Sequence, residues 1–278
     1  MTLLEVLQAA AGHLSKKGIE NPRLNAEHLL AHALGKTKRL DLYLDFDRPM
    51  GENAKAPFRE LIRRRSEGVP LQHLLGTVEF FGRTFACDAR ALIPRPETEQ
   101  LVEFILRRAQ EATSFLDVGT GSGILAITFA LEKTAARVEA CDISPEALAL
   151  AGENIRRHSL DGRLQPRLTS LLTGIPGRFN VIAANLPYIP TGEIPGLSRE
   201  VGHDPRTALD GGPDGLDLIR ELAVQAVHVL EPGGLLALET GIDQATTTAT
   251  WLALQNYRDI TIERDYQGVQ RFVFARHG

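Results

Sequence analysis

The sequence of residues 114–123 is SFLDVGTGSG, an apolar run that ends in three glycines at alternate positions. The apolar run predicts a buried strand at 114–118, and the apolar residues that follow predict a helix at 124–132. Glycines at alternate positions let the backbone turn sharply between the two elements and let a ligand approach without an obstructing Cβ atom. The segment therefore predicts a strand, a ligand-binding loop and a helix.

An acidic residue follows the next strand along the chain. That strand is expected at 137–141, and Asp142 comes after it, where a carboxylate can accept both hydroxyls of a ribose. Dinucleotide sites use GxGxxG, whereas here Ile124 stands where the last glycine would fall. S-adenosylmethionine has a ribose and an adenine but no pyrophosphate, so the pattern favours this cofactor. A dehydrogenase is a weaker alternative, and a purely structural glycine turn is the simpler one.

Strands and helices alternate through the rest of the chain. We expect helices at 145–158, 217–230 and 243–255, and strands at 179–184, 234–239, 260–264 and 271–275. Such alternation implies an open, mainly parallel sheet with helices on both faces, and ligands of such sheets bind beyond the carboxyl ends of the strands. The last two strands are joined through residues 266–268 and are therefore expected to be antiparallel.

The first 75 residues predict helices only. Asn21 and Pro22 indicate a helix start with Asn21 as the cap, Gly35 ends that helix, and a third helix is expected at 52–66. That helix bears Arg59, Arg63, Arg64 and Arg65. These arginines either form a solvent-exposed helix face or contact an acidic protein partner. Residues 77–93 predict a β-hairpin, and a helix is expected to start at Pro96. We therefore expect a helical domain at 1–75, a hairpin linker at 76–95 and a sheet domain at 96–278.

The strand at 179–184 runs into Asn185, Leu186, Pro187 and Tyr188, which should lie beside the glycine loop. A planar NH2 group is a poor nucleophile, so its methylation needs two acceptors that aim the nitrogen at the methyl donor. The Asn185 side chain can supply one acceptor and the Leu186 carbonyl the other, because Pro187 favours an extended residue 186. Tyr188 can pack against one face of the planar NH2-bearing group. The rate acceleration then comes from positioning and desolvation of the reacting nitrogen. The simpler alternative is a strand-ending turn.

Charge and composition exclude several classes of protein. The 278 residues include 31 Lys and Arg and 35 Asp and Glu, a net charge of −4, which disfavours a long nucleic acid as main partner. The first 75 residues hold 12 basic and 9 acidic side chains (+3), so the remainder holds 19 and 26 (−7). Cys87 and Cys141 are the only cysteines and have no zinc-ligand spacing. Without a long apolar run or a signal peptide, we expect no membrane contact and a cytoplasmic location.

Longer strings surround these motifs and cover most of the chain. They are EFFG at 79–82, LIPRPETE at 92–99, the glycine loop, DISPEAL at 142–148, NLPYIP at 185–190, ALDGGPDGL at 208–216 and LETG at 238–241. With them the chain resembles the protein-(glutamine-N5) methyltransferases that act on peptide chain release factors, the HemK/PrmC family. The strings at 92–99 and 208–216 are far more selective than the glycine loop alone.

The resemblance implies a fold, a reaction and a set of site residues. The fold would be an α/β, Rossmann-like class I S-adenosylmethionine-dependent methyltransferase. Its seven-stranded, mostly parallel sheet would have an antiparallel last strand, and a small N-terminal helical bundle would dock the release factor. The methyl group would go to the side-chain nitrogen, N5, of the glutamine in the Gly-Gly-Gln motif. The glutamine amide would be held by Asn185, Leu186, Pro187 and Tyr188, and the cofactor by Asp117, Gly119, Thr120, Gly121, Ser122, Gly123, Asp142, Ser170 and Asn185.

Two departures from the family pattern keep alternatives open. Leu186 replaces a usual proline, and Asn-Leu-Pro-Tyr also occurs in rRNA adenine dimethyltransferases. Thr169 and Ser170 stand where the family often has an aspartate and an aromatic residue, so adenine contacts are expected to be weaker or to come from the backbone. N6-adenine methylation of RNA or DNA and an inactive release-factor-binding adaptor are therefore the alternatives. No metal site is expected.

For several other residues the sequence allows more than one role. The aperiodic stretch 189–213 is expected to cover the substrate as a lid rather than to be a passive excursion. Within it, His203 and Asp204 are a catalytic pair or, more simply, a solvated or loop-anchoring segment. Arg95 and Glu97 either pin the junction after the hairpin or form a structural ion pair. Glu239 either orients the substrate turn or satisfies a buried amide.

Overall fold

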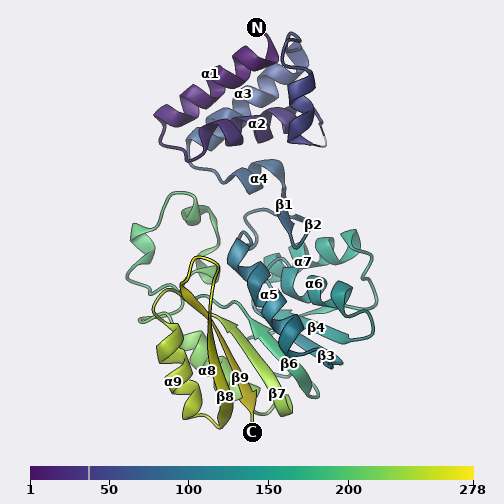
Figure 1. Ribbon diagram of the computed structural model, residues 1–278, viewed down its shortest axis with the longest axis vertical. Coiled ribbons are helices and arrows are strands. Elements are labelled where there is room, and N and C mark those ends of the chain that lie inside the picture. Colours follow the sequence, from purple (N-terminus) through teal and green to yellow (C-terminus); the bar gives the residue numbers. More distant parts are fainter. Residues whose placement is uncertain (37) are drawn as a thin grey trace. The chain divides into compact units, whose positions relative to one another are not determined.

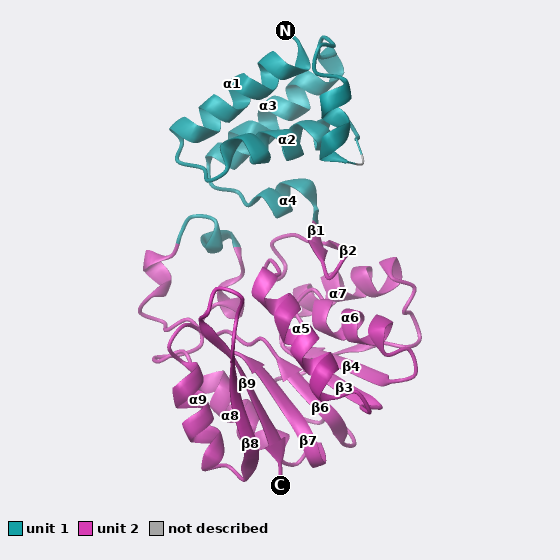
Figure 2. Cartoon of the chain, viewed as in Figure 1, with its two compact units in different colours: residues 1–77, 198–203 teal, residues 78–197, 204–278 magenta. Residues whose placement is uncertain are grey.

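The chain forms two units, each with a core of its own (Figure 2). The computed structural model describes residues 1–36 and 38–278. One unit comprises residues 1–77 together with 198–203, and the other comprises 78–197 together with 204–278. Apart from Thr77, the β-hairpin belongs to the same unit as the sheet, whereas residues 198–203 of the 189–213 segment belong to the N-terminal unit.

The first unit is helical, as predicted. Its elements are α1 (Leu3–Lys16), α2 (Pro22–Ala33), the 3-10 helix η1 (Arg39–Leu44), α3 (Glu52–Ser66), α4 (Leu71–Leu75) and the 3-10 helix η3 (Val201–His203). Leucines at helical spacing on α1 and α2 form a core with Leu42 and Phe58. Thr2 and Glu5 form a reciprocal capping box at the start of α1.

The expected role of Asn21 is wrong in one respect. Asn21 does precede α2, but its backbone is left-handed with φ at 47° and its side chain makes no capping hydrogen bond. A side-chain cap usually requires an extended residue at this position. Instead, the buried Asn25 side chain donates to the carbonyls of Glu20 and Asn21, at 3.0 and 3.2 Å.

The four arginines of α3 do not share one solvated face. Arg59 and Arg64 are exposed, and exposed Arg63 pairs with Glu60 and Glu67 on the same helix. Arg65 is buried, and its Nε donates to Asn25 Oδ1 at 2.7 Å. A buried, hydrogen-bonded guanidinium is part of the unit's internal structure, so only part of the run is available to a partner.

The second unit begins with the hairpin and continues with alternating strands and helices (Figure 1). Its strands are β1 (Thr77–Phe80), β2 (Arg83–Ala86), β3 (Ser114–Val118), β4 (Arg137–Asp142), β5 (Pro166–Leu168), β6 (Phe179–Ala184), β7 (Leu230–Glu239), β8 (Tyr257–Arg264) and β9 (Gln270–His277). Its helices are α5 (Pro96–Arg108), α6 (Ile124–Glu132), α7 (Pro145–Arg157), α8 (Asp217–Ala226) and α9 (Ala245–Ala253), with the 3-10 turns η2 (Ile194–Gly196) and η4 (Arg206–Ala208).

The large sheet has seven strands in the order β5-β4-β3-β6-β7-β9-β8. All neighbours are parallel except β9, which is antiparallel to both β7 and β8. This confirms the predicted fold class, including the antiparallel last strand. Since β3 and β6 are neighbours, the glycine loop after β3 and the Asn185 turn after β6 emerge at the same edge of the sheet.

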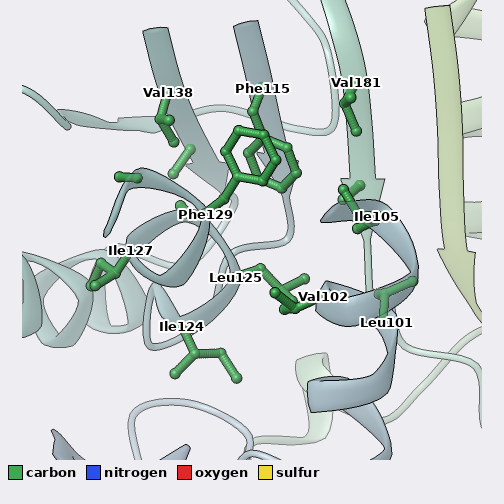
Figure 3. Close-up of a cluster of buried hydrophobic side chains, with 14 of the residues drawn as sticks. Leu101, Val102, Ile105, Phe115, Ile124, Leu125, Ile127, Phe129, Val138 and Val181 are labelled. Atoms are coloured by element: carbon green, nitrogen blue, oxygen red, sulfur yellow. The ribbon is translucent and has the colours of Figure 1, made fainter. Parts of the chain in front are cut away.

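Alternating residues of the central strands fill two different cores. Phe115 points toward α5 and α6 and stacks on Phe129, with ring centroids 4.1 Å apart (Figure 3). Its neighbour Leu116 belongs to the opposite core, together with residues of α8 and α9. Side chains alternate across a strand, so a sheet covered on both faces needs apolar residues at successive positions.

Several element bounds differ from those expected. The helix predicted at 217–230 ends at Ala226, because Leu230 pairs with Phe179 and already belongs to β7. The apolar periodicity continues past Ala226, so a single-sequence pattern cannot show this end. α9 is shorter than expected, and β8 and β9 are longer by two or more residues. The edge strand β5, three residues long, was not among the elements bounded from the sequence.

No helix among the described residues is both long and apolar enough to cross a membrane.

Candidate functional site

The glycine loop turns through left-handed backbone conformations. Gly119, Gly121 and Gly123 have φ values of 70°, 55° and 84°, which side-chain-bearing residues rarely adopt. The N–H groups of Gly119 and Thr120 both donate to the Cys141 carbonyl at 2.9 Å, which ties the loop to the end of β4. α6 starts directly after Gly123. The alternate glycines are therefore needed for the backbone path itself.

Asp117 holds this loop from inside the protein. Its Oδ2 accepts from the Thr120 hydroxyl at 2.6 Å and from the Ala126 N–H at 3.2 Å. The carboxyl is fully buried, and burial raises its pKa to about 7. Asp117, Thr120, Ser122 and Gly123 are not among the residues that line the adjoining cavity. Direct cofactor contacts by these four residues stay a prediction, whereas the hydrogen bonds of Asp117 and Thr120 support the loop.

A cavity lies at the carboxyl ends of β3, β4 and β6. Seven of the residues predicted for the site line it, namely Gly119, Gly121, Asp142, Ser170, Asn185, Leu186 and Pro187. Thr169 also lines it. The wall is completed by residues that were not predicted as site residues, among them Ala91, Leu92, Ile143, Ser144, Pro205, Thr207 and Ala208. The edge of the sheet thus brings together both halves of the predicted site.

Asp142 and Ile143 form a polar and an apolar wall side by side. Asp142 accepts from the Gly121 N–H at 2.8 Å through one oxygen and from the Ser144 N–H at 2.9 Å through the other. Ile143 is 64% exposed and lines the cavity, an unusual position for a large aliphatic side chain. Its place directly after the acidic residue was the sequence signal that could have identified it.

The Asn185 turn packs directly on the glycine loop. Leu186 is buried, and a Cβ atom added at Gly119 would lie only 2.8 Å from Leu186 Cδ2. The leucine that replaces the usual proline therefore fills the space that the absent Gly119 side chain leaves. Whether the Leu186 carbonyl accepts from a ligand stays a prediction.

The Asn185 side chain offers a buried acceptor. Its Nδ2 donates to the Thr98 hydroxyl on α5 at 3.2 Å. Its Oδ1 is buried and has no hydrogen-bond partner among the described residues. Buried polar atoms are nearly always paired, so this unpaired oxygen beside the cavity is available to a donor group of a ligand.

A buried carboxyl lies behind Asn185. The Thr98 hydroxyl donates to Glu239 Oε2, at the end of β7, at 2.9 Å. Burial raises the pKa of Glu239 to about 7, against the opposing effects of Thr98, Arg271 and Asn185. Burial and the nearby Glu239 charge likewise raise the pKa of Tyr188 to about 12. Glu239 interacts both with Thr98 and with the Asn185 amide, so each of the two roles left open for it stays a prediction.

The backbone of the turn is fixed by the segment 211–215 and by Gln244. The Gln244 Nε2 donates to the Tyr188 carbonyl at 2.8 Å, and its Oε1 accepts from the Gly241 N–H at 2.8 Å. A Cβ atom at Gly211 would lie 2.6 Å from the Pro187 carbonyl oxygen, and one at Gly215 would lie 2.1 Å from that of Tyr188. Both glycines are therefore required by close backbone approach to the turn. The sequence contains the string at 208–216, but the close approach of its glycines to the turn is visible only in the structure.

The segment 189–213 is anchored by Asp204. This carboxylate is buried, and it accepts from Arg95 Nη2 at 2.9 Å and from the Ile93 N–H at 3.3 Å. His203 is exposed and belongs to the other unit. Asp204 therefore anchors the loop, which is one of the two roles expected for it. The ion pair of Arg95 is with Asp204 rather than with Glu97. Pro205, Thr207 and Ala208 contribute to the cavity wall.

Within residues 1–36 and 38–278, no group of three or more His, Cys, Asp or Glu side chains could hold a metal ion.

Comparison with known proteins covers both units. A family model described as the PrmC N-terminal domain matches residues 5–76, and one described as ribosomal protein L11 methyltransferase (PrmA) matches residues 95–188. A release factor glutamine methyltransferase of Geobacter sulfurreducens is 42% identical over 100% of this chain and 97% of its own length. One from Deinococcus radiodurans is 42% identical over 99% of each chain.

Solved structures resemble the fold. A methyltransferase from Pyrococcus furiosus matches with a TM-score of 0.53 and 18% identity, over 71% of this chain and 90% of that one. At that identity the likeness describes the arrangement of the sheet and its helices.

Proposed function

We propose a specific reaction for this chain, which belongs to the release factor glutamine methyltransferase family. The family predicted from the strings at 92–99 and 208–216 is thereby confirmed, and with it an S-adenosylmethionine-dependent methyltransferase activity. In the proposed reaction, the methyl group goes to the side-chain amide nitrogen, N5, of the glutamine in the Gly-Gly-Gln motif of peptide chain release factors.

The residues around the cavity fit S-adenosylmethionine. Asp142 would hold the ribose hydroxyls, the glycines at 119 and 121 leave room for close approach, and exposed Ile143 would cover the adenine. Ser170 and Thr169 would contact the same end of the cofactor. When bound, the cofactor supplies an electrophilic methyl group on a sulfonium. Asp117, Thr120, Ser122 and Gly123 would act mainly by holding the loop in shape.

The buried Asn185 Oδ1 is the observation that supports the glutamine site most strongly. This oxygen would accept one N–H of the substrate amide, and the Leu186 carbonyl would accept the other. Pro187 and Tyr188 would shape the turn and wall the flat amide. The neutral Asn185 side chain aims the nitrogen without adding a fixed anion, so positioning and exclusion of water supply the rate.

The helical region 1–75 would dock the release factor, with 76–95 as a linking hairpin and 96–278 as the catalytic domain. A groove of about 850 Å³ in the first unit supports this role. It is lined by apolar side chains such as Val6, Phe58 and Ile62, and by basic ones, among them His13, Lys17, Lys55, Arg59 and Arg199. A folded protein with an acidic, partly apolar surface would fit it. We place the reaction in the cytoplasm, where release factors act, without membrane or direct nucleic-acid contact.

The alternatives predict other outcomes. N6-adenine methylation would use the same turn, but it calls for a basic channel, and the chain has a net charge of −4. An inactive adaptor would not need the free acceptor on Asn185.

Transfer of label distinguishes these functions. The protein is incubated with methyl-labelled S-adenosylmethionine and either a release factor or the variant in which the Gly-Gly-Gln glutamine is replaced by alanine. We expect label on the amide nitrogen of that glutamine, identified by mass spectrometry, and none on the variant. Label found only on RNA would establish the adenine alternative, and a stable complex without transfer would establish the adaptor.

A further inference from the structure

Three side chains from three separate elements form a buried hydrogen-bonded series behind the cavity. They are Asn185 after β6, Thr98 on α5 and Glu239 at the end of β7, with Thr98 and Glu239 2% and 1% exposed. Asn185 Nδ2 donates to the Thr98 hydroxyl, which donates to Glu239 Oε2. Neither Thr98 nor Glu239 lines the cavity, so both act on a substrate through Asn185.

The number of protons in this series decides which way the Asn185 carboxamide faces. A threonine hydroxyl has one proton, and an ionised carboxylate only accepts. With Glu239 ionised, the Thr98 proton goes to Glu239, so Thr98 can only accept from Asn185. The amide NH2 then faces Thr98 and the oxygen is left free. With Glu239 protonated, its proton can go to Thr98, the Thr98 proton can go to Asn185 Oδ1, and the amide turns its NH2 group outward.

The surroundings of Glu239 make both states accessible near neutral pH. Arg271 on β9 stabilises the ionised form, and its own Nε is bound to Asp265 Oδ2 at 2.8 Å. Glu97 on α5 disfavours the ionised form, and Tyr188 faces Glu239 from the substrate turn. Burial outweighs the stabilising groups and raises the pKa of Glu239 to about 7.

We propose that Thr98 and ionised Glu239 are positioning residues that hold the Asn185 oxygen free for the substrate amide, and that protonation of Glu239 reverses the amide. The proposal rests on the function proposed above for Asn185. It adds a proton-dependent control to a site whose two predicted acceptors, a side-chain amide and a backbone carbonyl, do not titrate.

Variants of Thr98 separate the hydroxyl from its volume. Thr98→Val keeps the shape but removes the hydroxyl. We expect kcat to fall about tenfold, because the Asn185 oxygen is then no longer held toward the substrate amide. Thr98→Ser restores the hydroxyl and should restore most of kcat. Thr128→Val, at a fully buried threonine of α6, is the matched control and should leave kcat unchanged. Equal kcat values for Thr98→Val and Thr98→Ser would overturn the proposal.

The pH dependence tests the role of Glu239. In the wild type, kcat should fall as the pH drops through about 7, because the folded-state carboxyl takes up its proton there. In Glu239→Gln, which has no ionisable group, kcat should be lower and nearly constant between pH 6 and 8. A wild-type slope retained in Glu239→Gln would contradict the proposal.

A measurement without substrate distinguishes this proposal from the proposed function. In 15N NMR spectra of the whole protein, the Asn185 side-chain NH2 signals should shift with a midpoint near pH 7 in the wild type and not in Glu239→Gln. The Asn185→Ala spectrum assigns those signals. Signals that are independent of pH in the wild type would overturn the proposal even if glutamine methylation is confirmed.

Discussion

The glycine loop and the Asn185 turn adjoin the same cavity but are stabilised in different ways. Asp117, behind the loop, bonds to Thr120 and Ala126, three and nine residues away. Asn185, in the turn, bonds to Thr98, which bonds to Glu239, 87 and 141 residues apart. Both carboxyls are buried, and burial raises both pKa values to about 7. The contacts that support the loop can therefore be deduced from a short motif, whereas the distant contacts behind the turn cannot.

The two regions should also differ in the step that they support, and Asn185→Ala tests this most strongly. Loss of the acceptor should lower turnover at least ~10²-fold, because the substrate nitrogen is no longer aimed. Affinity for S-adenosylmethionine, measured by calorimetry, should be largely kept, since the glycine loop is intact. Unchanged turnover, or an equal loss of cofactor affinity, would remove the functional distinction between loop and turn.

The contact between the two regions is the next point to test. Gly119→Ala would place a Cβ atom 2.8 Å from Leu186 and a side chain at φ 70°. We expect about 2 kcal/mol of lost stability, of which about 1–2 kcal/mol is left-handed strain, with weaker cofactor binding and slower turnover.

Gly82→Ala is the matched control for this variant. Gly82 in the hairpin has φ 69°, and a Cβ atom there meets nothing within 4 Å. Chemical denaturation should therefore show the strain alone, with activity intact. If both variants lose the same stability and keep activity, the packing of Leu186 on Gly119 does not join the two regions.

The buried carboxyls allow a comparison by pH. The pKa of Asp117 is about 7 in the folded protein and is expected near 4 when unfolded, so the folded state binds the proton more tightly. Its contribution to stability is therefore complete below about pH 4 and is lost as the pH rises through about 7. The unfolding free energy of the wild type should fall between pH 5 and 7 and level off above, and Asp117→Asn should reduce that fall by about 2–3 kcal/mol.

Glu239→Gln should flatten the stability profile similarly, since the sign of its pKa shift is the same. The two variants should differ in kcat. Glu239→Gln should remove the pH dependence of kcat, whereas Asp117→Asn should keep it. A loss of the kcat profile in Asp117→Asn would place the titrating group in the loop instead of behind the turn.

The sequence predicted the fold and much of the cavity for the same physical reason. Buried parallel strands, glycines that require left-handed backbone and an acidic residue at the end of β4 are all local patterns, and they identified Gly119, Gly121 and Asp142. The turn was found because Asn185, Pro187 and Tyr188 lie within four consecutive residues. Thr98 was not singled out, and the role of Glu239 stayed open, because their meeting depends on how α5 packs against β7. The end of α8 was misplaced for a related reason, since Leu230 is drawn into the sheet by Phe179.

Ile143 gives the smallest expected effect and the sharpest separation of the two regions. Its side chain is 64% exposed, so Ile143→Ala should barely change stability. Loss of apolar cover for the adenine should weaken S-adenosylmethionine binding by about 1 kcal/mol, roughly fivefold in Kd. At saturating cofactor, kcat and the KM for the release factor should be unchanged, the opposite of Asn185→Ala. Leu254→Ala, at a 75% exposed leucine away from the cavity, is the matched control. A change in kcat rather than in Kd would mean that the wall next to Asp142 also positions the substrate, and the two regions would then act as one.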